Sequence, residues 1–237
     1  MDVERILAGN LAAVRQRIAE AARRAGRRPA EAALVAVTKN RPIRLIEALL
    51  AAGQRVFGEN RVQEALPKIA AFEGSPAGGP NPEWHLIGHL QGNKAKPAAQ
   101  YFTLIHSADS ERILAALDRI GREQGKTVRA LLQVNTSGEA QKSGCSAEEA
   151  HGLFVRAEGL SGVRLEGLMT MAALVPEPEL ARPSFRALRV LRDQLLEKGV
   201  QPERLRRLSM GMSSDFEVAV EEGATLVRVG SALFQGL

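Results

Sequence analysis

The sequence predicts an α/β protein of the TIM type, a (β/α)8 barrel with an extra N-terminal helix. After residue 24, short apolar runs of strand length alternate with segments of helical period, which is typical of repeated βα units around a parallel sheet. Eight such runs can be counted, as a closed barrel of this type requires. The length of 237 residues is also typical of one such barrel. We therefore expect a single domain over residues 1–237.

The expected elements follow from these runs in chain order. The N-terminal 24 residues mix acidic, basic and apolar residues at helical spacing and are unlike a signal peptide, so we expect a folded helix there. Ser146 with Glu149, and Ser214 with Glu217, have the spacing of a capping box. The expected strands are residues 34–38, 55–58, 84–88, 102–107, 128–135, 164–169, 207–210 and 226–230. Clear helical segments are residues 43–52, 61–71, 110–124, 147–158 and 185–198.

Two irregular stretches interrupt this alternation. Residues 73–82 are rich in Gly and Pro, but they fall between a helix and its next strand, which indicates a loop rather than a domain linker. Residues 170–183 follow the sixth strand, so they should overhang the C-terminal mouth of the barrel. We expect this second stretch to form a lid.

Composition excludes several classes of protein. No apolar run approaches the roughly 20 residues that span a bilayer, so we expect no membrane partner. The single Cys145 cannot form an internal disulfide and lacks zinc-site spacing, which fits a reducing, cytoplasmic location. The scattered histidines form no metal-binding pattern, so we expect no metal. These histidines are His85, His89, His106 and His151.

The basic charge raises the question of nucleic acid. The net charge is +5, the isoelectric point is about 9.8, and four arginines gather at the end of the first helix. These arginines, at positions 23, 24, 27 and 28, close an amphipathic helix, where cations favour the helix dipole. Aromatic residues make up only 4% of the chain, too few for base-stacking platforms. We expect no nucleic-acid partner.

Chemistry in a parallel barrel is found where strands end, so the polar residues that follow each apolar run are the candidates. Lys39 ends the first run, and Asn60 follows the second. A lysine at the end of a strand is usually solvated. In an apolar setting, however, its neutral amine would be favoured, and a neutral amine attacks an aldehyde to form an imine. Lys39 is therefore a candidate attachment site for an aldehyde cofactor.

The last two strands are followed by short glycine-bearing turns, SMGMSSD and RVGSA, that precede helices. Backbone N–H groups in such turns, the helix dipole, and the hydroxyls of Ser209 and Ser231 would together make an anion cradle. Barrels often bind a phosphate after strands seven and eight. The alternative is that Gly211 and Gly230 only allow tight turns.

Arg228 lies two residues before Gly230, so both share one face of the last strand. Its neighbours are apolar, and a buried arginine requires a partner. One possible partner is the pyridine nitrogen of pyridoxal phosphate, which faces a guanidinium in some proteins that bind it. The other is a carboxylate inside the barrel.

Several motifs then occur in order along nearly the whole chain. They are AVTKN (36–40), FGEN (57–60), WHLIG with LQGNK (84–94), HSADS (106–110), VNTSGEAQKSG (134–144), GLMTM (167–171), LSMGMSSDFEVAVEEG (208–223) and VRVGSALF (227–234). On these motifs the chain resembles the pyridoxal phosphate homeostasis proteins, a group similar to the N-terminal barrel of alanine racemase. Minor departures from the family pattern, such as Arg61 and Gly92, lie beside the motifs.

The resemblance implies a cofactor, pyridoxal 5'-phosphate, held as an imine on Lys39. It implies that Arg228 faces the pyridine nitrogen and that Asn60 and His85 line the ring. A histidine inside an apolar strand is, however, more often a core residue. The residues that the resemblance implies for the phosphate are Ser209, Met210, Gly211, Gly230 and Ser231.

The sequence favours a cofactor carrier over an enzyme. Arginine has no spare proton to make a pyridinium, so the cofactor would be a weak electron sink. Racemisation needs an acid/base group on each face of the substrate, and Lys39 supplies only one. The only tyrosine, Tyr101, precedes the fourth strand and should lie at the opposite mouth. We therefore expect a protein of intracellular pyridoxal phosphate homeostasis, affecting amino-acid and vitamin metabolism.

Other interpretations stay open. The chain could be a weak racemase or lyase with Lys39 as the catalytic base and His85 or water opposite. It could also be a phosphosugar-binding barrel without cofactor. For the carrier, we expect apo-enzymes that need the cofactor as partners. Because alanine racemase-like proteins dimerise through a second domain, we also expect a monomer.

Overall fold

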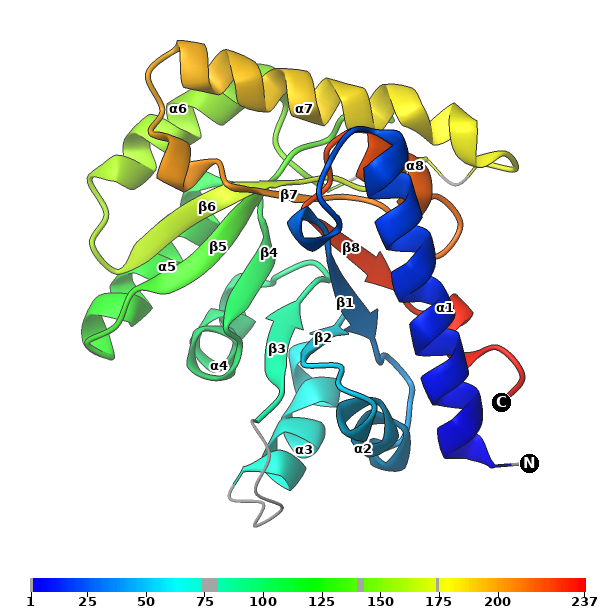
Figure 1. Cartoon of the computed structure of the whole chain (residues 1–237). Coiled ribbons are helices and arrows are strands. Elements are labelled where there is room, and N and C mark those ends of the chain that lie inside the picture. The colour runs from blue at the N-terminus through cyan, green and yellow to red at the C-terminus, as the bar shows by residue number, and fades with distance from the viewer. Residues whose placement is uncertain (1, 74–80, 140–142, 174) are drawn as a thin grey trace.

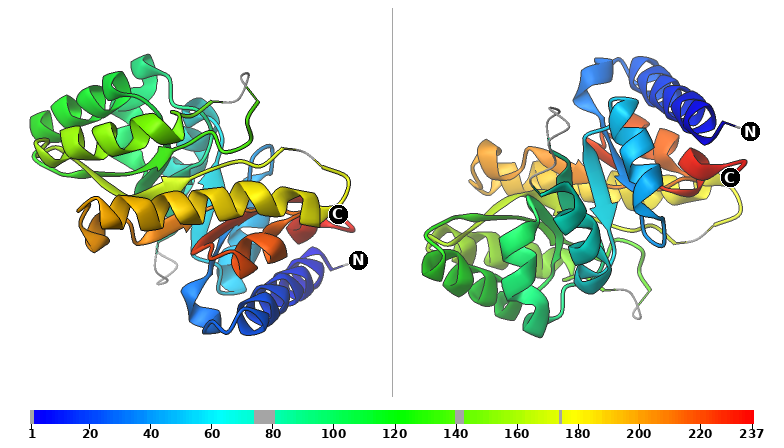
Figure 2. Two further views of the ribbon diagram at one scale, coloured as in Figure 1. Left: turned by 90° about the horizontal axis from the view of Figure 1, so that it is seen from above. Right: turned by 90° about the horizontal axis from the view of Figure 1, so that it is seen from below.

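The computed structural model confirms the TIM-type barrel. It describes residues 2–73, 81–139, 143–173 and 175–237. Eight parallel strands pair in chain order, and β8 pairs back onto β1 to close the barrel (Figure 1). The helices surround this sheet, and Figure 2 shows the same arrangement from above and below.

The bounds of the elements agree closely with the expected ones. The strands are β1 (Ala33–Val37), β2 (Val56–Glu59), β3 (Glu83–Leu86), β4 (Leu104–Ala108), β5 (Val128–Gln133), β6 (Val163–Met169), β7 (Arg207–Ser209) and β8 (Leu226–Val229). The α-helices are α1 (Val3–Arg24), α2 (Ile43–Ala51), α3 (Val62–Phe72), α4 (Ala95–Tyr101), α5 (Glu111–Glu123), α6 (Ala147–Glu158), α7 (Arg182–Glu197) and α8 (Phe216–Glu221). The 3-10 helices are η1 (Pro29–Glu31), η2 (Gly92–Lys94), η3 (Pro178–Ala181), η4 (Pro202–Arg204) and η5 (Ser231–Phe234).

The barrel wall separates two apolar layers. The large layer lies between the strands and the surrounding helices and includes Ala36, Phe57 and Val227. A smaller cluster fills the interior of the barrel, because successive side chains on a strand point to opposite faces. This interior cluster consists of Val35, Val37, Ile87, Leu104, Leu131, Met169 and Leu226. The alternation also assigns Arg228 to the interior, since it shares a face with Leu226.

The extra helix α1 runs along the outside of the barrel. Asp2 caps it by accepting hydrogen bonds from the N–H groups of Glu4 and Arg5. Its buried face packs against α2, α8 and η5. The amide of Asn10 donates to two carbonyl groups near the C-terminus, so α1 also holds the last turn of the chain in place.

The basic cluster at the end of α1 is largely ion-paired. Arg24 pairs with Glu217 and Glu221 of the neighbouring α8. Arg27 and Arg28 both pair with Glu31. In the part of the chain that the structure describes, no helix has the length and apolarity to cross a bilayer.

The two irregular stretches differ in how far they can be described. Residues 74–80 of the expected loop lie outside the described residues. Thr170, the first residue of the expected lid, is fully buried, and its hydroxyl donates to the carbonyl of Val134. η3 follows, and α7 begins at Arg182, one residue before the end of the stretch. The lid function stays a prediction.

One of the two expected capping boxes forms. The hydroxyl of Ser146 accepts from the N–H of Glu149, and the carboxylate of Glu149 accepts from the N–H of Ser146. The second expectation was wrong, because α8 begins after Asp215 rather than after Ser214. Asp215 instead accepts from the N–H of Met212, which tightens the turn that follows β7.

Ser146 forms a capping box and Ser214 does not, so their replacement should affect stability differently. Ser146→Ala should lower the free energy of unfolding by about 1 kcal/mol, since it leaves the first turn of α6 without its side-chain acceptor. Ser214→Ala, at a position with the same sequence spacing but no box, should change it by less than about 0.5 kcal/mol. Urea unfolding of both variants would measure this, and equal losses would contradict the assignment of the cap.

Candidate functional site

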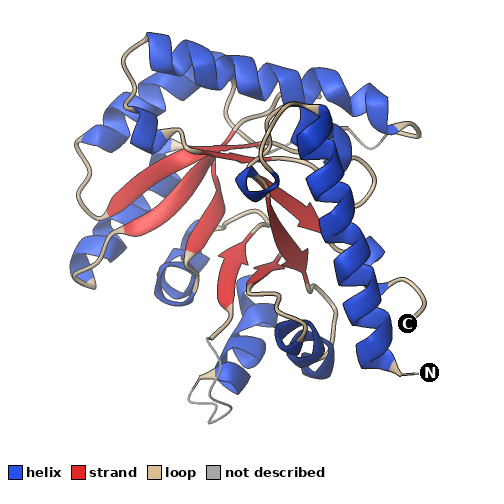
Figure 3. Ribbon diagram, viewed as in Figure 1, coloured by secondary structure: helices blue, strands red, loops and turns tan. Residues whose placement is uncertain are grey.

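The residues expected at the site gather at one end of the barrel. They lie on β1, β2, β3, β7 and β8 or directly after these strands, at the arrowheads in Figure 3. This is the C-terminal mouth, where barrels of this type carry their chemistry. The structure thus brings together segments that are almost 200 residues apart in the sequence.

Lys39 lies just beyond the end of β1, in a turn whose next residue, Asn40, has a positive φ of 58°. Its side chain is exposed, so the apolar setting expected for it was wrong. The reason is that β1 ends at Val37, and Thr38 is the last buried residue before the turn. Lys39 is therefore accessible to a ligand at the mouth.

A buried ion pair holds the residue before Lys39. The ammonium of Lys68, on α3, donates to the carbonyl of Thr38 at 2.7 Å and pairs with a carboxylate oxygen of Glu59 at 2.7 Å. The hydroxyl of Thr38 donates to the same oxygen at 2.6 Å. Because Glu59 is fully buried and Lys68 is 9% exposed, this pair is well protected from water. It fixes the backbone from which Lys39 projects.

Arg228 carries a buried charge. It is 3% exposed, and its guanidinium donates to the Ser209 hydroxyl at 2.6 Å and to the Thr170 carbonyl at 2.9 Å. Burial lowers its pKa to about 10, and Asp215 acts weakly in the opposite direction. Among the described residues, no carboxylate lies within ion-pair distance of Arg228. The carboxylate partner considered as an alternative is therefore not found there.

A chain of hydrogen bonds continues from Arg228 across the barrel interior. The Ser209 hydroxyl lies 2.8 Å from Nδ1 of His106, and Nε2 of His106 lies 3.0 Å from Nδ1 of His85. Four strands supply these side chains, namely β8, β7, β4 and β3. Arg228 can only donate, whereas each imidazole can donate at one nitrogen and accept at the other. The chain is fully bonded in either of the two proton arrangements.

The two imidazoles are neutral over the physiological pH range. Burial lowers the pKa of His85 to about 3, and the positive charges of Arg207 and Arg129 act in the same direction. Burial also places the pKa of His106 well below its usual value, and His85 and Arg228 lower it further. An uncharged pair next to Arg228 avoids a second buried cation.

This geometry changes two expectations. The hydroxyl of Ser209 was expected at the anion cradle, but it points into the barrel and lies between Arg228 and His106. Ser209 is fully buried and His85 is 4% exposed. Ile87, two residues after His85, lies on the same face and closer to the mouth. The structure thus places His85 in the polar core, and its contact with a ligand ring stays a prediction.

The backbone of the two glycine turns is partly available for an anion, because the N–H groups of Met212 and Gly230 already donate to Asp215 and Ser213. Gly211 has a φ of 92°, and a Cβ there would lie 2.5 Å from the Cβ of Ala219, so both backbone conformation and packing require glycine. Met210 beside it is fully buried. After β8, η5 begins at Ser231, whose N–H and exposed hydroxyl lie at the start of this short helix.

Ser213 closes this cradle from the other turn. Its hydroxyl accepts from the N–H of Gly230 at 3.0 Å, which ties the loop after β7 to the loop after β8. The sequence pattern did not single out Ser213. A second hydroxyl in the SMGMSSD turn was the available signal.

Asn60 lies after β2 and lines a surface cavity of about 340 Å³ with Gly88, Gln91 and Lys94. A Cβ on Gly88 would lie 2.2 Å from the Asn60 carbonyl oxygen, so glycine allows the FGEN and WHLIG motifs to meet. The hydroxyl of Ser107 donates to the Gly88 carbonyl and holds this contact. Asn60 thus lies on the β2–β3 side of the mouth.

Neither a reactive cysteine nor a metal site is found among the described residues. Burial raises the pKa of the Cys145 thiol to about 12, so this buried cysteine is a poor nucleophile. Within the described ranges, no group of three or more His, Cys, Asp or Glu side chains is arranged to hold a metal ion.

The fold and the mouth define a class of protein, a parallel (β/α)8 barrel with glycine-bearing turns after β7 and β8 and a buried arginine on β8. The family described as "Alanine racemase, N-terminal domain" matches residues 9–237. The pyridoxal phosphate homeostasis protein of Pseudomonas aeruginosa is 43% identical over 96% of this chain and 94% of that protein. The pyridoxal phosphate homeostasis protein of Escherichia coli K12 is 39% identical over 96% of this chain and 95% of that protein. The chain therefore belongs to the pyridoxal phosphate homeostasis proteins within the alanine racemase N-terminal domain family.

Solved structures agree with this assignment. PipY of Synechococcus elongatus with PLP bound is 37% identical and superposes with a TM-score of 0.82 over 96% of this chain and 99% of that chain. Alanine racemase from Clostridium difficile is 15% identical, with a TM-score of 0.70 over 86% of this chain and 52% of that chain. At that identity the likeness shows a shared barrel fold.

The depressed histidine pKa gives a prediction for stability against pH. Between about pH 6.5 and pH 3, unfolded His85 binds a proton that folded His85 does not, so stability falls as the pH falls. His85→Gln can keep the hydrogen bond to His106 but cannot take up a proton. It should reduce the loss of unfolding free energy between pH 6 and pH 4 by about 2 kcal/mol.

Urea unfolding at several pH values would measure this difference. His151→Gln is the control for removing a histidine outside the barrel interior. An unchanged pH dependence in His85→Gln would contradict the neutral, buried state of His85.

Proposed function

We propose that the C-terminal mouth binds pyridoxal 5'-phosphate and that the protein acts in the intracellular homeostasis of this cofactor, by buffering or delivery. The observation that carries the proposal is the buried Arg228, whose guanidinium has no carboxylate partner among the described residues and lies beside an anion cradle. The names of the homologues and the PLP-bound structure of PipY support the same ligand.

The residues of the mouth fit the cofactor part by part. Its phosphate suits the two glycine turns, with Gly211 and Ser231 as ligands, while Met210 and Gly230 support the turns because the Gly230 N–H already donates to Ser213. Ser213 keeps these turns together through its bond to the Gly230 N–H. We assign Ser209 to the support of Arg228 rather than to the phosphate, because its hydroxyl is already bonded to Arg228 and His106.

Arg228 would face the pyridine nitrogen of the cofactor. When bound, pyridoxal phosphate supplies an electron-withdrawing ring and an aldehyde. A guanidinium donates a hydrogen bond to the ring nitrogen but gives up no proton, so it does not enhance electron withdrawal as a pyridinium would. The neutral His106 behind Ser209 likewise offers no proton from an imidazolium. This arrangement favours storage of the cofactor over reactions that require a strong electron sink.

Lys39 would provide covalent attachment, in which a neutral amine condenses with the aldehyde with loss of one water. The buried pair of Lys68 and Glu59 fixes the Thr38 backbone and leaves the Lys39 side chain exposed at the mouth. An exposed lysine can reach a diffusing ligand without opening the core.

The alternative, a weak racemase or lyase, requires a second acid/base group opposite Lys39. His85 or water was the candidate, but the low pKa of His85 makes its imidazole neutral and a weak base, and its Nδ1 is bonded to His106. Tyr101 lies at the end of α4, before β4, and so on the opposite side of the barrel. These positions favour the carrier. Apo-enzymes as partners, a monomeric state and a cytoplasmic location belong to the same proposal.

Covalent attachment of pyridoxal phosphate to Lys39 can be detected by absorption and by peptide mapping. Protein mixed with pyridoxal phosphate should develop a visible absorption band, and borohydride reduction followed by peptide mapping should place the label on Lys39. Lys39→Ala should lose both, because Lys39 is the lysine that follows a barrel strand at this mouth, two residues after β1. Lys198→Ala, at the end of α7, is the control and should behave as the wild type.

Label spread over surface lysines would contradict the attachment site. A protein that stays colourless at saturating cofactor would instead favour the phosphosugar-binding barrel, for which the cradle alone suffices.

The second prediction separates carrier from enzyme. Cofactor-loaded protein should transfer pyridoxal phosphate to an apo-enzyme faster than free diffusion explains, and deletion of the protein should shift the free cofactor pool. The loaded protein should show no exchange of amino-acid α-hydrogen with solvent deuterium, because the opposite acid/base group is lacking. Exchange at turnover-like rates would support the enzyme, and the absence of both transfer and a pool shift would overturn the carrier.

A further inference from the structure

A second cluster of arginines lies at the opposite, N-terminal mouth of the barrel. Arg129 lies near the start of β5, Arg164 near the start of β6, and Arg207 begins β7. All three donate to one carboxylate, that of Glu166, at 2.6–3.2 Å. Arg207 uses only Nε for this contact.

This arrangement is unbalanced in charge. Glu166 is 7% exposed, and although burial alone would raise its pKa, hydrogen bonds and charge from the arginines lower it to about 2. It is therefore ionised, but its single negative charge is shared by three guanidinium groups. Like charges held this close destabilise one another unless further anions are present.

The neighbouring carboxylates do not restore the balance. Glu31 pairs with Arg27 and Arg28, which belong to another part of the surface. Glu203 lies 3.8 Å from the adjacent Arg206 and neutralises that side chain. Glu83 acts on Arg129 electrostatically, but it does not come within ion-pair distance among the described contacts.

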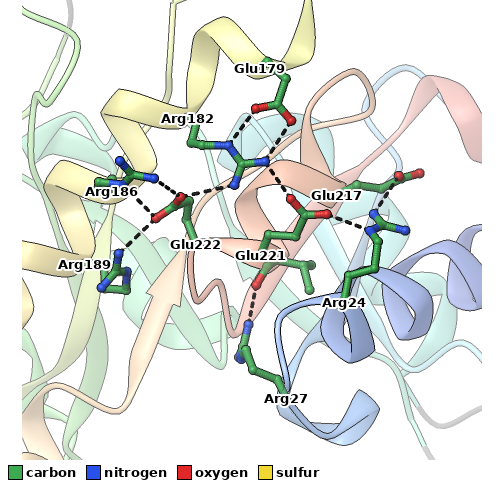
Figure 4. Close-up of polar contacts among 10 residues, drawn as sticks. Arg24, Arg27, Glu179, Arg182, Arg186, Arg189, Glu217, Glu221 and Glu222 are labelled. Atoms are coloured by element: carbon green, nitrogen blue, oxygen red, sulfur yellow. Dashed lines mark hydrogen bonds and ion pairs between the residues drawn. The ribbon is translucent and has the colours of Figure 1, made fainter.

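A cluster elsewhere on the molecule is closer to charge balance. Glu222, directly after α8, also receives three arginines, Arg182, Arg186 and Arg189 (Figure 4). There, however, Arg182 also pairs with Glu179 and Glu221. With Arg17 and Arg24, the network joins five arginines to four carboxylates, Glu179, Glu217, Glu221 and Glu222.

The arginines at the N-terminal mouth also face open space. With Glu166 they line a cavity of about 510 Å³, whose other lining residues are Glu31, Ala33, Glu203, Arg206, Thr225 and Leu226. Both Nη groups of Arg207 have no acceptor among the described residues, and neither does Nη1 of Arg129 or of Arg164. Arg207 is one-third exposed, so its free donors are accessible.

We propose that this cavity is a second anion site, which takes a small phosphate-bearing anion at the N-terminal mouth, opposite the cofactor mouth. Arg207 donates from its two Nη groups, and Arg129 and Arg164 add one group each, in the fork geometry that suits phosphate oxygens. Glu166 holds the three guanidinium groups in place and is not itself a ligand. The bound anion supplies the negative charge that the cluster lacks.

Calorimetric titration with inorganic phosphate tests this site, against potassium chloride of equal ionic strength. We expect the wild type to show a class of phosphate site that Arg207→Gln weakens about tenfold or more, because two charge-assisted donors are lost. Arg186→Gln, in the more nearly balanced cluster of Figure 4, is the matched control and should titrate as the wild type.

Phosphate can also enter the glycine cradle, and the variants separate the two places. Binding at the cradle alone predicts identical titrations for Arg207→Gln and the wild type, which would overturn the proposal. Arg164→Gln provides a second, more exposed variant if Arg207→Gln unfolds, and it should weaken the same class of site. If potassium chloride of equal ionic strength abolished the heat of phosphate binding to the wild type, that result would also overturn the proposal.

Discussion

The site depends on one buried positive charge. Arg228 sits inside the barrel without a carboxylate partner among the described residues, and its surroundings are arranged to tolerate it. Ser209 and the Thr170 carbonyl accept its hydrogen bonds, and the two histidines behind Ser209 stay neutral. An isolated buried cation is costly, so such a position persists only where a ligand or a fixed set of dipoles compensates it. The polar core of the barrel is thus organised by the need to hold this guanidinium.

The same constraint explains why the strand order matters. The chain from Arg228 to His85 crosses from β8 and β7 to β4 and β3, so no single βα unit contains it. Closure of the barrel brings these strands within reach of one another. On the outside, the Lys68–Glu59 pair connects α3, β2 and the end of β1 in a similar way. Both networks therefore form only when the whole fold forms, and both converge on the mouth.

The fold could be predicted well from the sequence because runs of apolar residues mark the strands that become buried. All eight strands lie within two residues of their expected bounds, and one such difference, the early end of β5 at Gln133, arises because Val134 forms an isolated bridge with Cys145. The short helices α4 and α8 carry too few turns to show a clear period. At the site, the motifs located Lys39, Arg228 and the glycine turns. They could not show that the Ser209 hydroxyl points inward, since that depends on Arg228, His106 and His85 from three other strands.

The charged groups of the barrel interior are close neighbours. Arg207 lies two residues before Ser209 on β7, so their side chains share one face of that strand. The apolar residues Val35 and Leu104 lie at the level of the polar chain, because Val35 pairs with Arg228 and Leu104 pairs with His85 in the sheet. The positive charges of Arg207 and Arg129 both lower the pKa of His85. The arginines at the strand starts therefore help to keep this buried imidazole neutral, and a neutral imidazole adds no second cation to the chain that holds Arg228.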